Sequence, residues 1–242
     1  RLILPIIISA DKSGENMKIL PFIFAVVTAL LPVITQKTGL SEKHGFNMKM
    51  LCAFMYIVTG VISALSLYRV TAYSVMILTA LLLGILGDFF LEYKSKKLFP
   101  LGAAFFGIGH IVYSCTFLFV GTYKALSHIE IVAGITLVLS AVTLLFAKVK
   151  LRLKGKKKLI LAYAPVLIFA FASALVSGGL AMNEGNLSFG MCLIFGGVLF
   201  FASDIMIGVG KGGIKRPKLL HNAVSYTYFA AQALFALSIY FQ

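Results

Sequence analysis

The chain has 242 residues, of which 60% are hydrophobic and 12% are charged, and its mean hydropathy is +0.98. A soluble domain has roughly 45–50% apolar and about 25% charged residues, so the composition excludes an ordinary soluble domain and indicates a polytopic membrane protein. The formal net charge of +14 does not indicate a nucleic-acid partner, because no binding module and no interleaved aromatic residues accompany the basic residues.

Eight segments are long and apolar enough to span a bilayer, which requires about 20 mostly apolar residues per helix. They are residues 17–36, 50–68, 72–91, 99–121, 128–147, 159–179, 188–209 and 221–240. Because the connections are short, the sequence predicts an all-α transmembrane bundle with one domain over residues 17–242. Residues 1–16 contain an apolar stretch that is too short to span, so we expect an N-terminal extension or interfacial segment there.

Basic residues gather in alternate connections, at residues 37–49, 92–98, 148–158 and 210–220. The positive-inside rule predicts that these four connections face the cytoplasm. Because the number of spans is even, both termini are then expected on the non-cytoplasmic side. We expect an integral, multi-pass protein of a bacterial cytoplasmic membrane, with membrane lipids around it.

Only eight residues are acidic, and two of them, Asp88 and Asp204, follow long apolar stretches within predicted spans. A carboxylate at membrane depth costs several kcal/mol, which makes each acid a candidate functional residue. Both acids are expected at similar depth on the cytoplasmic side, with Asp204 the deeper, so we predict a shared site. The alternative is an acid that pairs with a nearby base or caps a helix, and the bases at Lys94 to Lys97 are close to Asp88.

Polar residues on other spans are candidate neighbours of the two acids. His110 and Tyr113 share a face of the fourth span, and the eighth span has a polar stripe at spacings of four, three and four. Such a stripe must face protein or water rather than lipid, although interhelical hydrogen bonding alone also accounts for it. The candidates for orienting substrate or water are His110, Tyr113, Ser203, Ser225, Tyr228 and Gln232, and His221 begins the stripe.

A metal site is not expected. A hydrolytic zinc site usually needs three protein ligands, and of the four histidines, His44 and His128 fall in connections on opposite sides. The three cysteines lie in apolar segments without the spacing of a disulfide framework or metal knuckle. We therefore predict no required metal and no cofactor.

Four motifs follow one another on successive spans. They are Gly87-Asp88-Phe89-Phe90-Leu91, His110-Ile111-Val112-Tyr113, Ser203-Asp204, and Thr227-Tyr228-Phe229-Ala230-Ala231-Gln232. With this combination, residues 80–240 resemble the YhhN family of integral membrane proteins, which includes lysoplasmalogenase. Family members often carry Lys-Pro before the helix with the Gly-Asp motif, whereas this chain has Lys49-Met50, which leaves open how a headgroup is held.

The resemblance implies that residues 17–242 are a catalytic domain that hydrolyses the vinyl ether bond of lysoplasmalogens. A lysophospholipid substrate would then give a fatty aldehyde and glycerophospho-ethanolamine or -choline. This chemistry needs a proton donor and a group that stabilises a cation or activates water, and two carboxyls can divide these roles as in glycoside hydrolysis. We expect Asp204 to be the general acid, because of its depth, and Asp88 to be the stabiliser.

Three other functions remain open from the sequence. Intramembrane carboxylates also serve proton-coupled transporters or flippases of lipids and weak acids. A lipid-binding or lipid-sensing protein without chemistry, and a metal-dependent hydrolase of lipid esters or amides, are further alternatives. The headgroup, the chain length and the oligomeric state are not specified by these residues.

Overall fold

The structure is a computed structural model that describes residues 3–92, 98–120, 125–150, 157–211 and 218–242. Within these ranges the chain forms helices and their connections without any strand. The elements are α1 (Ile3–Lys37), α2 (Leu40–Lys43), α3 (Gly45–Leu65), α4 (Ala72–Glu92), α5 (Phe99–Cys115), the π-helical η1 (Thr116–Val120), the 3-10 helix η2 (Ala125–His128), α6 (Ile129–Lys150), α7 (Lys157–Asn183), α8 (Leu187–Lys211) and α9 (Lys218–Phe241). Side chains are described for residues 18–92, 98–120, 125–145, 161–208, 220 and 222–242.

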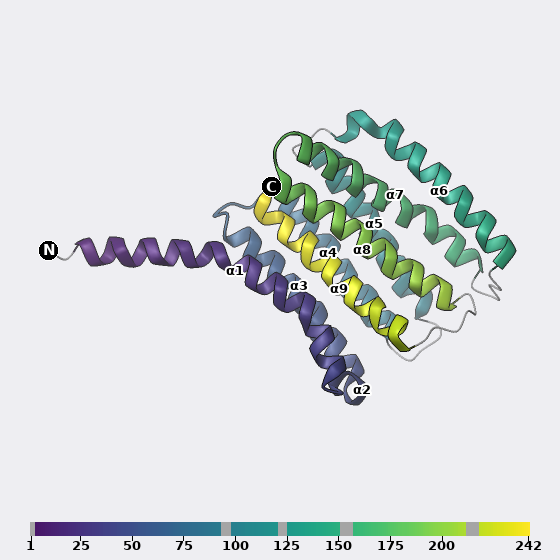
Figure 1. Cartoon of the computed structure of the whole chain (residues 1–242), viewed down its shortest axis with the longest axis horizontal. Coiled ribbons are helices and arrows are strands. Elements are labelled where there is room, and N and C mark those ends of the chain that lie inside the picture. The colour runs from purple at the N-terminus through teal and green to yellow at the C-terminus, as the bar shows by residue number, and fades with distance from the viewer. Residues whose placement is uncertain (1–2, 93–97, 121–124, 151–156, 212–217) are drawn as a thin grey trace.

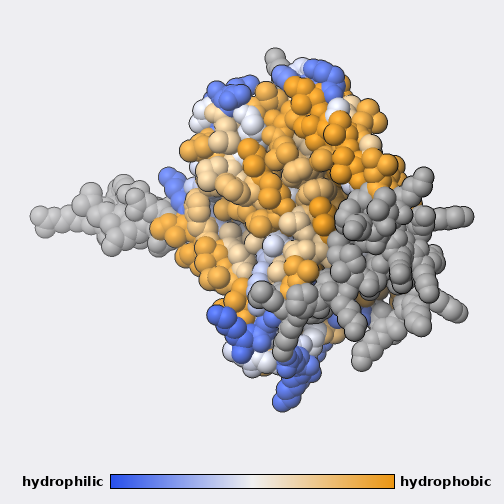
Figure 2. Space-filling model, turned by 45° about the vertical axis from the view of Figure 1, so that its right-hand side comes forward, coloured by the Kyte–Doolittle hydropathy of each residue, from blue (hydrophilic) through white to orange (hydrophobic). Residues whose placement is uncertain are grey.

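Eight of these helices are long and apolar enough to cross a membrane, which confirms the predicted all-α transmembrane bundle. Backbone groups in hydrocarbon must be paired within their own segment, and a helix meets that requirement. Figure 2 shows hydrophobic residues over the middle of the visible face and hydrophilic residues gathered at its two ends. The orientation of the termini across the membrane stays a prediction.

Two boundaries differ from the sequence prediction. Helix α1 runs from Ile3 without a break through the predicted boundary at residue 16, and its N-terminal part extends away from the bundle (Figure 1). The predicted connection 37–49 is largely helical, because α2 follows a left-handed Gly39 (φ 75°) and α3 already begins at Gly45. Lys49 is therefore a helix residue rather than a connection residue, and the site depends on this difference.

The helices form two layers (Figure 1). Helices α1, α9, α8 and α7 pack in that order in one layer, and α3, α4 and α5 form the layer behind it. Helix α9 contacts α1, α3, α4 and α8, so its side chains are enclosed on several sides. Helix α6 lies at the edge of the bundle, where it packs on α7. This arrangement directs the polar stripe of α9 into the interior.

One end of the bundle contains a cavity with polar residues in its lining. Residues at the C-terminal ends of α1, α4 and α8 surround a common cavity with residues at the N-terminal ends of α3, α5 and α9. We call this the polar end. The helix ends that flank three of the basic connections, 37–49, 92–98 and 210–220, therefore meet at this end.

The contact between α7 and α8 depends on two glycines. A Cβ atom on Gly190 would lie 2.5 Å from the carbonyl oxygen of Gly178, and a Cβ on Gly178 would lie 2.9 Å from the carbonyl oxygen of Gly190. Membrane helices use such small residues for close backbone approach. We expect Gly190→Ala to destabilise the protein by about 1–3 kcal/mol, as overpacking does, and to lower its melting temperature in detergent. Gly134→Ala is the matched control, because nothing lies within 4 Å of its added Cβ, and equal melting temperatures of the two variants would contradict the prediction.

Candidate active site

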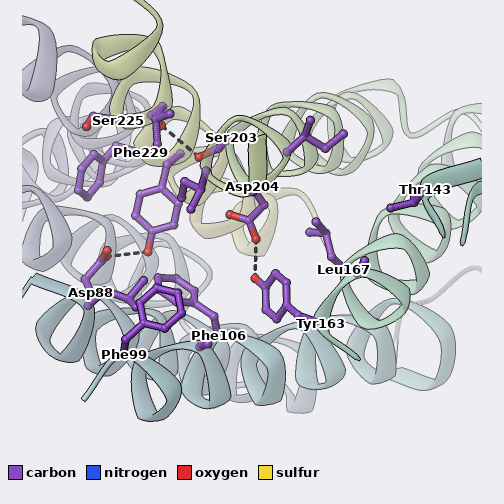
Figure 3. Close-up of a pocket in the computed structure, with 18 of the residues that line it drawn as sticks. Asp88, Phe99, Phe106, Thr143, Tyr163, Leu167, Ser203, Asp204, Ser225 and Phe229 are labelled. Carbon is purple, nitrogen blue, oxygen red and sulfur yellow. Dashed lines mark hydrogen bonds between the residues drawn. The ribbon is translucent and has the colours of Figure 1, made fainter. Parts of the chain in front are cut away.

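Asp88 and Asp204 line one cavity of about 390 Å³ (Figure 3). The cavity lies between α4, α5, α6, α7, α8 and α9, with Lys49 of α3 at one side. Its walls are mainly apolar, with Leu91, Phe99, Phe106, Val142, Leu167, Ile205, Ile207 and Phe229 among them. A concave apolar site with a few convergent polar groups is the usual form of a small-molecule pocket, and its volume is within the usual range of about 300–1,000 Å³.

Both oxygens of Asp88 have partners. The Lys49 ammonium lies 3.1 Å from Oδ1, and the Tyr228 hydroxyl donates a hydrogen bond of 2.7 Å to Oδ2. The Asp88 side chain is only 3% exposed, so its charge needs such a partner. Lys49 also lies 3.3 Å from Oε2 of Glu92. Asp88 is therefore paired with a cation through one oxygen and hydrogen-bonded through the other.

A chain of hydrogen bonds supports Tyr228. The amide nitrogen of Gln232 donates to the Tyr228 hydroxyl at 3.2 Å, and the Tyr113 hydroxyl donates to the Gln232 amide oxygen at 2.7 Å. All three residues are buried. These hydrogen bonds join the predicted polar faces of α5 and α9 and orient Tyr228 toward Asp88.

Asp204 has a different environment. Its Oδ2 accepts a hydrogen bond of 2.5 Å from the Tyr163 hydroxyl and lies 3.3 Å from Nε2 of His110, which in turn lies 2.8 Å from the Tyr163 oxygen. Among the described residues, Oδ1 has no hydrogen-bond partner. Figure 3 shows one Asp204 oxygen directed at Tyr163 and the other directed away from it. Asp204 therefore retains one oxygen for a substrate or water.

The two acids also differ in how far they are exposed. The side chain of Asp204 is 9% exposed, compared with 3% for Asp88. Asp88 is the more enclosed acid because Lys49 and Tyr228 cover its two oxygens. The two acids therefore differ in their partners and in their exposure, and their relative depth in the membrane stays a prediction.

An aromatic ring connects the two networks. The Phe200 ring centroid lies 4.7 Å from that of His110 and 5.4 Å from that of Tyr228. Phe200 is buried, so it holds both polar groups in position and keeps bulk water from the space between them.

The two serine candidates have separate places. The Ser203 hydroxyl donates to the carbonyl oxygen of Val224 at 3.1 Å, which ties α8 to α9 and matches the interhelical alternative. Ser225 lines the cavity and also the neighbouring cavity at the polar end. The side chain of His221 lies outside the described residues.

Two residues that contact the acids, Lys49 and Tyr163, were not predicted as site residues from the sequence. Lys49 was counted among the connection residues that set the orientation, and the resemblance pointed to it only through the change from the family's Lys-Pro to Lys49-Met50. Tyr163 lies near the start of its span, where tyrosine is typical of the membrane interface. The sequence alone does not show that Lys49 or Tyr163 reaches a carboxylate on another helix.

Metal ligands do not gather in the described part of the chain. No group of three or more His, Cys, Asp or Glu side chains is placed to hold a metal ion there. His110 beside Asp204 is a two-residue pair, which falls short of the usual three protein ligands. That no metal is required stays a prediction.

A second cavity of about 490 Å³ lies at the polar end and shares Lys49, Ser225 and Phe229 with the first. Its lining is more polar and includes Gln36, Glu42, Glu92 and Asn222. The basic residues of the connections 92–98 and 210–220 have their side chains outside the described residues, at Lys94, Lys96, Lys97, Lys211, Lys215, Arg216 and Lys218. Among the described side chains, Lys49 is the base that lines both cavities.

Comparison with known proteins agrees with the motifs at this site. No curated protein and no solved structure gives a significant match to the chain. The model of the YhhN family matches residues 43–239, which include Lys49, both aspartates and the residues hydrogen-bonded to them. The chain therefore belongs to the YhhN family.

Proposed function

We propose that this protein is a membrane hydrolase that cleaves the vinyl ether bond of lysoplasmalogens. The observation that carries the proposal is the pair of unlike carboxyl groups in one apolar cavity. Asp88 is paired with a cation through one oxygen and with Tyr228 through the other, whereas Asp204 has one oxygen without a partner among the described residues. The products are a fatty aldehyde and a glycerophospho-alcohol such as glycerophospho-ethanolamine or -choline.

The reaction begins when a proton adds to the β carbon of the vinyl ether. The double bond becomes a single bond, and the adjacent carbon and oxygen share the positive charge of an oxocarbenium ion. Water adds to that carbon and loses a proton, which gives a hemiacetal. The hemiacetal then collapses to the aldehyde and the free hydroxyl of the glycerol, so one water is consumed and the proton is returned.

Asp204 fits the part of the proton donor. Two carboxyl groups in different environments divide into an acid and a charged stabiliser, as they do in glycosidases. Lys49 compensates a negative charge on Asp88, while Asp204 faces a hydroxyl and an imidazole. The second oxygen of Asp204 delivers the proton and later accepts one from the attacking water.

Asp88 fits the part of the cation stabiliser. A fixed negative charge in a site without bulk water stabilises a developing positive charge much more than it would in water. Tyr228, held by Gln232, keeps the carboxylate of Asp88 oriented. His110 and Tyr163 hold Asp204 in position through their contacts with its Oδ2.

The lipid chain fits the apolar part of the cavity. Val142 and Thr143 of α6 and Leu167 of α7 line it, and Figure 3 shows Thr143 and Leu167 on the far side of Asp204 from Asp88. Helix α6 packs on α7 at the edge of the bundle, so a chain that enters beside α6 passes from the bilayer to the acids without crossing water.

The direct test is aldehyde release by the purified protein in detergent. We expect release from 1-alkenyl lysophospholipid, no fatty acid release from the 1-acyl analogue, and the same rate with a chelator present. Cleavage of the acyl lipid that stops with chelator would favour the metal-dependent hydrolase. Lipid movement across vesicles without any aldehyde would favour the transporter, and either result would end the proposal.

A hydroxyl deletion tests the network around Asp204. We expect Tyr163→Phe to lower aldehyde release by about 10–100-fold, because Asp204 and His110 both lose a partner that positions them. The matched control is Tyr73→Phe, which also removes a buried hydroxyl, in this case one bonded to Ser238 at 2.8 Å. Tyr73 does not line the cavity, so its variant should lose stability but keep activity, and equal activities of the two variants would contradict the role of Tyr163.

A further inference from the structure

Aromatic rings form part of the wall of the cavity that contains the two acids. They belong to Phe99, Phe106, Tyr163, Tyr228 and Phe229. The face of an aromatic ring carries partial negative charge, so it attracts a cation that lies within about 6 Å of the ring centroid. Such rings let the wall of an apolar cavity stabilise positive charge without a second buried carboxylate.

The position of the Phe106 ring is set by Gly87. A Cβ atom on Gly87 would lie 2.6 Å from Cδ2, 2.7 Å from Cε2 and 3.0 Å from Cγ of Phe106. Three neighbouring ring atoms at such similar distances place a face of the ring, rather than its edge, on Gly87. Gly87 directly precedes Asp88 in α4, so this contact fixes the ring next to the acid.

The rest of the Phe106 ring is open to the cavity. Phe106 is only partly buried and lines the cavity together with Asp88 (Figure 3). Because one face lies on Gly87, the opposite face and the rim are the parts of the ring that remain for the cavity. Phe229, in contrast, is 2% exposed, and its ring centroid lies 4.9 Å from that of Tyr228. Phe106 therefore offers a ring surface to a bound molecule, whereas Phe229 is enclosed by protein.

The charge on Asp88 is partly cancelled by its partner. The Lys49 ammonium lies 3.1 Å from Oδ1 of Asp88. A carboxylate beside an ammonium attracts a second cation less strongly than a lone carboxylate does, because the two opposite charges act on that cation together. A cation formed in this cavity thus gains from a further stabilising group, and a ring face is one that Lys49 does not neutralise.

We propose that Phe106 is a further catalytic residue, whose ring face stabilises the oxocarbenium ion together with Asp88. The ion forms between the ring and the carboxylate, so its charge is attracted from two sides. The proposal rests on the proposed function for the identity of this cation. It also favours a substrate class, because the cleavage of a vinyl ether passes through a cation, whereas ester hydrolysis passes through an anion that a ring face does not stabilise.

Stepwise fluorination tests the ring without removing it. Phenylalanine analogues with one, two and three ring fluorines are incorporated at position 106, and each fluorine withdraws negative charge from the face while it lies in the ring plane. We expect kcat/KM for aldehyde release to fall in steps, by about tenfold for the trifluorinated ring. The matched control is the same series at Phe105, which stacks on Phe90 with a centroid distance of 5.4 Å and is not among the described residues that line the cavity. Fluorination there should leave kcat/KM unchanged.

A binding measurement gives a second readout without turnover. The probes are two lysolipids with the same phosphoethanolamine headgroup, a 1-alkyl ether and a 1-alkylamine in which a protonated nitrogen replaces the ether oxygen. The amine mimics the charge of the oxocarbenium ion. We expect the unmodified protein to bind the amine about tenfold more tightly than the ether, and the trifluorinated Phe106 ring to reduce this preference to about threefold or less.

The amine preference decides the role of Phe106. A preference that falls along the Phe106 series but not along the Phe105 series supports it. No preference in the unmodified protein, a preference that does not change with fluorination of Phe106, or an equal fall along both series would overturn it, whatever the rate of aldehyde release. A protein that shows the Phe106-dependent preference but releases no aldehyde would overturn the proposed reaction and leave the cation site standing.

Discussion

Asp204→Asn should abolish most aldehyde release while leaving the bundle folded. Asparagine has nearly the same shape as aspartate and keeps an oxygen that can accept the Tyr163 hydrogen bond. It cannot donate a carboxylic acid proton, so the step that creates the oxocarbenium ion loses its proton source. We expect a fall of about 10²–10⁴-fold in kcat/KM, the usual contribution of a general acid.

The controls separate chemistry from folding. Glu130→Gln removes an exposed carboxylate of α6 that does not line the cavity, and it should retain wild-type activity. The melting temperature of Asp204→Asn should stay close to that of the wild type, because no cation among the described residues depends on Asp204 apart from a protonated His110. Near wild-type aldehyde release from folded Asp204→Asn would remove Asp204 as the acid.

The sequence predicted the features that follow from the absence of water in the bilayer core. An apolar stretch of about 20 residues must be a helix in a bilayer, and all eight predicted spans are present. An acid in such a span must find an enclosed polar partner, which identified Asp88 and Asp204. The polar stripe of α9 had to face protein for the same reason, and Tyr228 and Gln232 do so.

The partners of the acids could not be predicted, because they depend on how helices rotate and approach. Whether the base that balances Asp88 is Lys49 or one of the lysines after Glu92 depends on the rotation of α3 and on its start at Gly45. Tyr163 reaches Asp204 because α7 packs between α5 and α8. Neither distance has a signature in residue spacing, since each contact joins helices that are far apart in the chain.

Lys49→Met should be the most destabilising single change at the site. It leaves the Asp88 carboxylate, which is 3% exposed, without its cation, whereas Glu92 is 42% exposed and can be solvated. Removing one partner of a buried pair costs about 3–5 kcal/mol, and we expect about 3 kcal/mol here because Lys49 itself is 27% exposed. The measurement is the melting temperature in detergent, together with aldehyde release, which should also be lost.

The double variant Lys49→Met/Asp88→Asn distinguishes a lost charge pair from lost packing. Without the Asp88 carboxylate no buried charge is left without its partner, because Glu92 is exposed. The neutral amide at position 88 can still accept the Tyr228 hydrogen bond, so stability should recover toward the wild type. Activity should not recover, because the charge that stabilises the cation is absent. A double variant as unstable as Lys49→Met alone would show that the packing of Lys49, rather than its charge, supports the helices. Recovery of stability without activity would show that Asp88 and Lys49 are kept together for chemistry, because the fold is then stable without either charge.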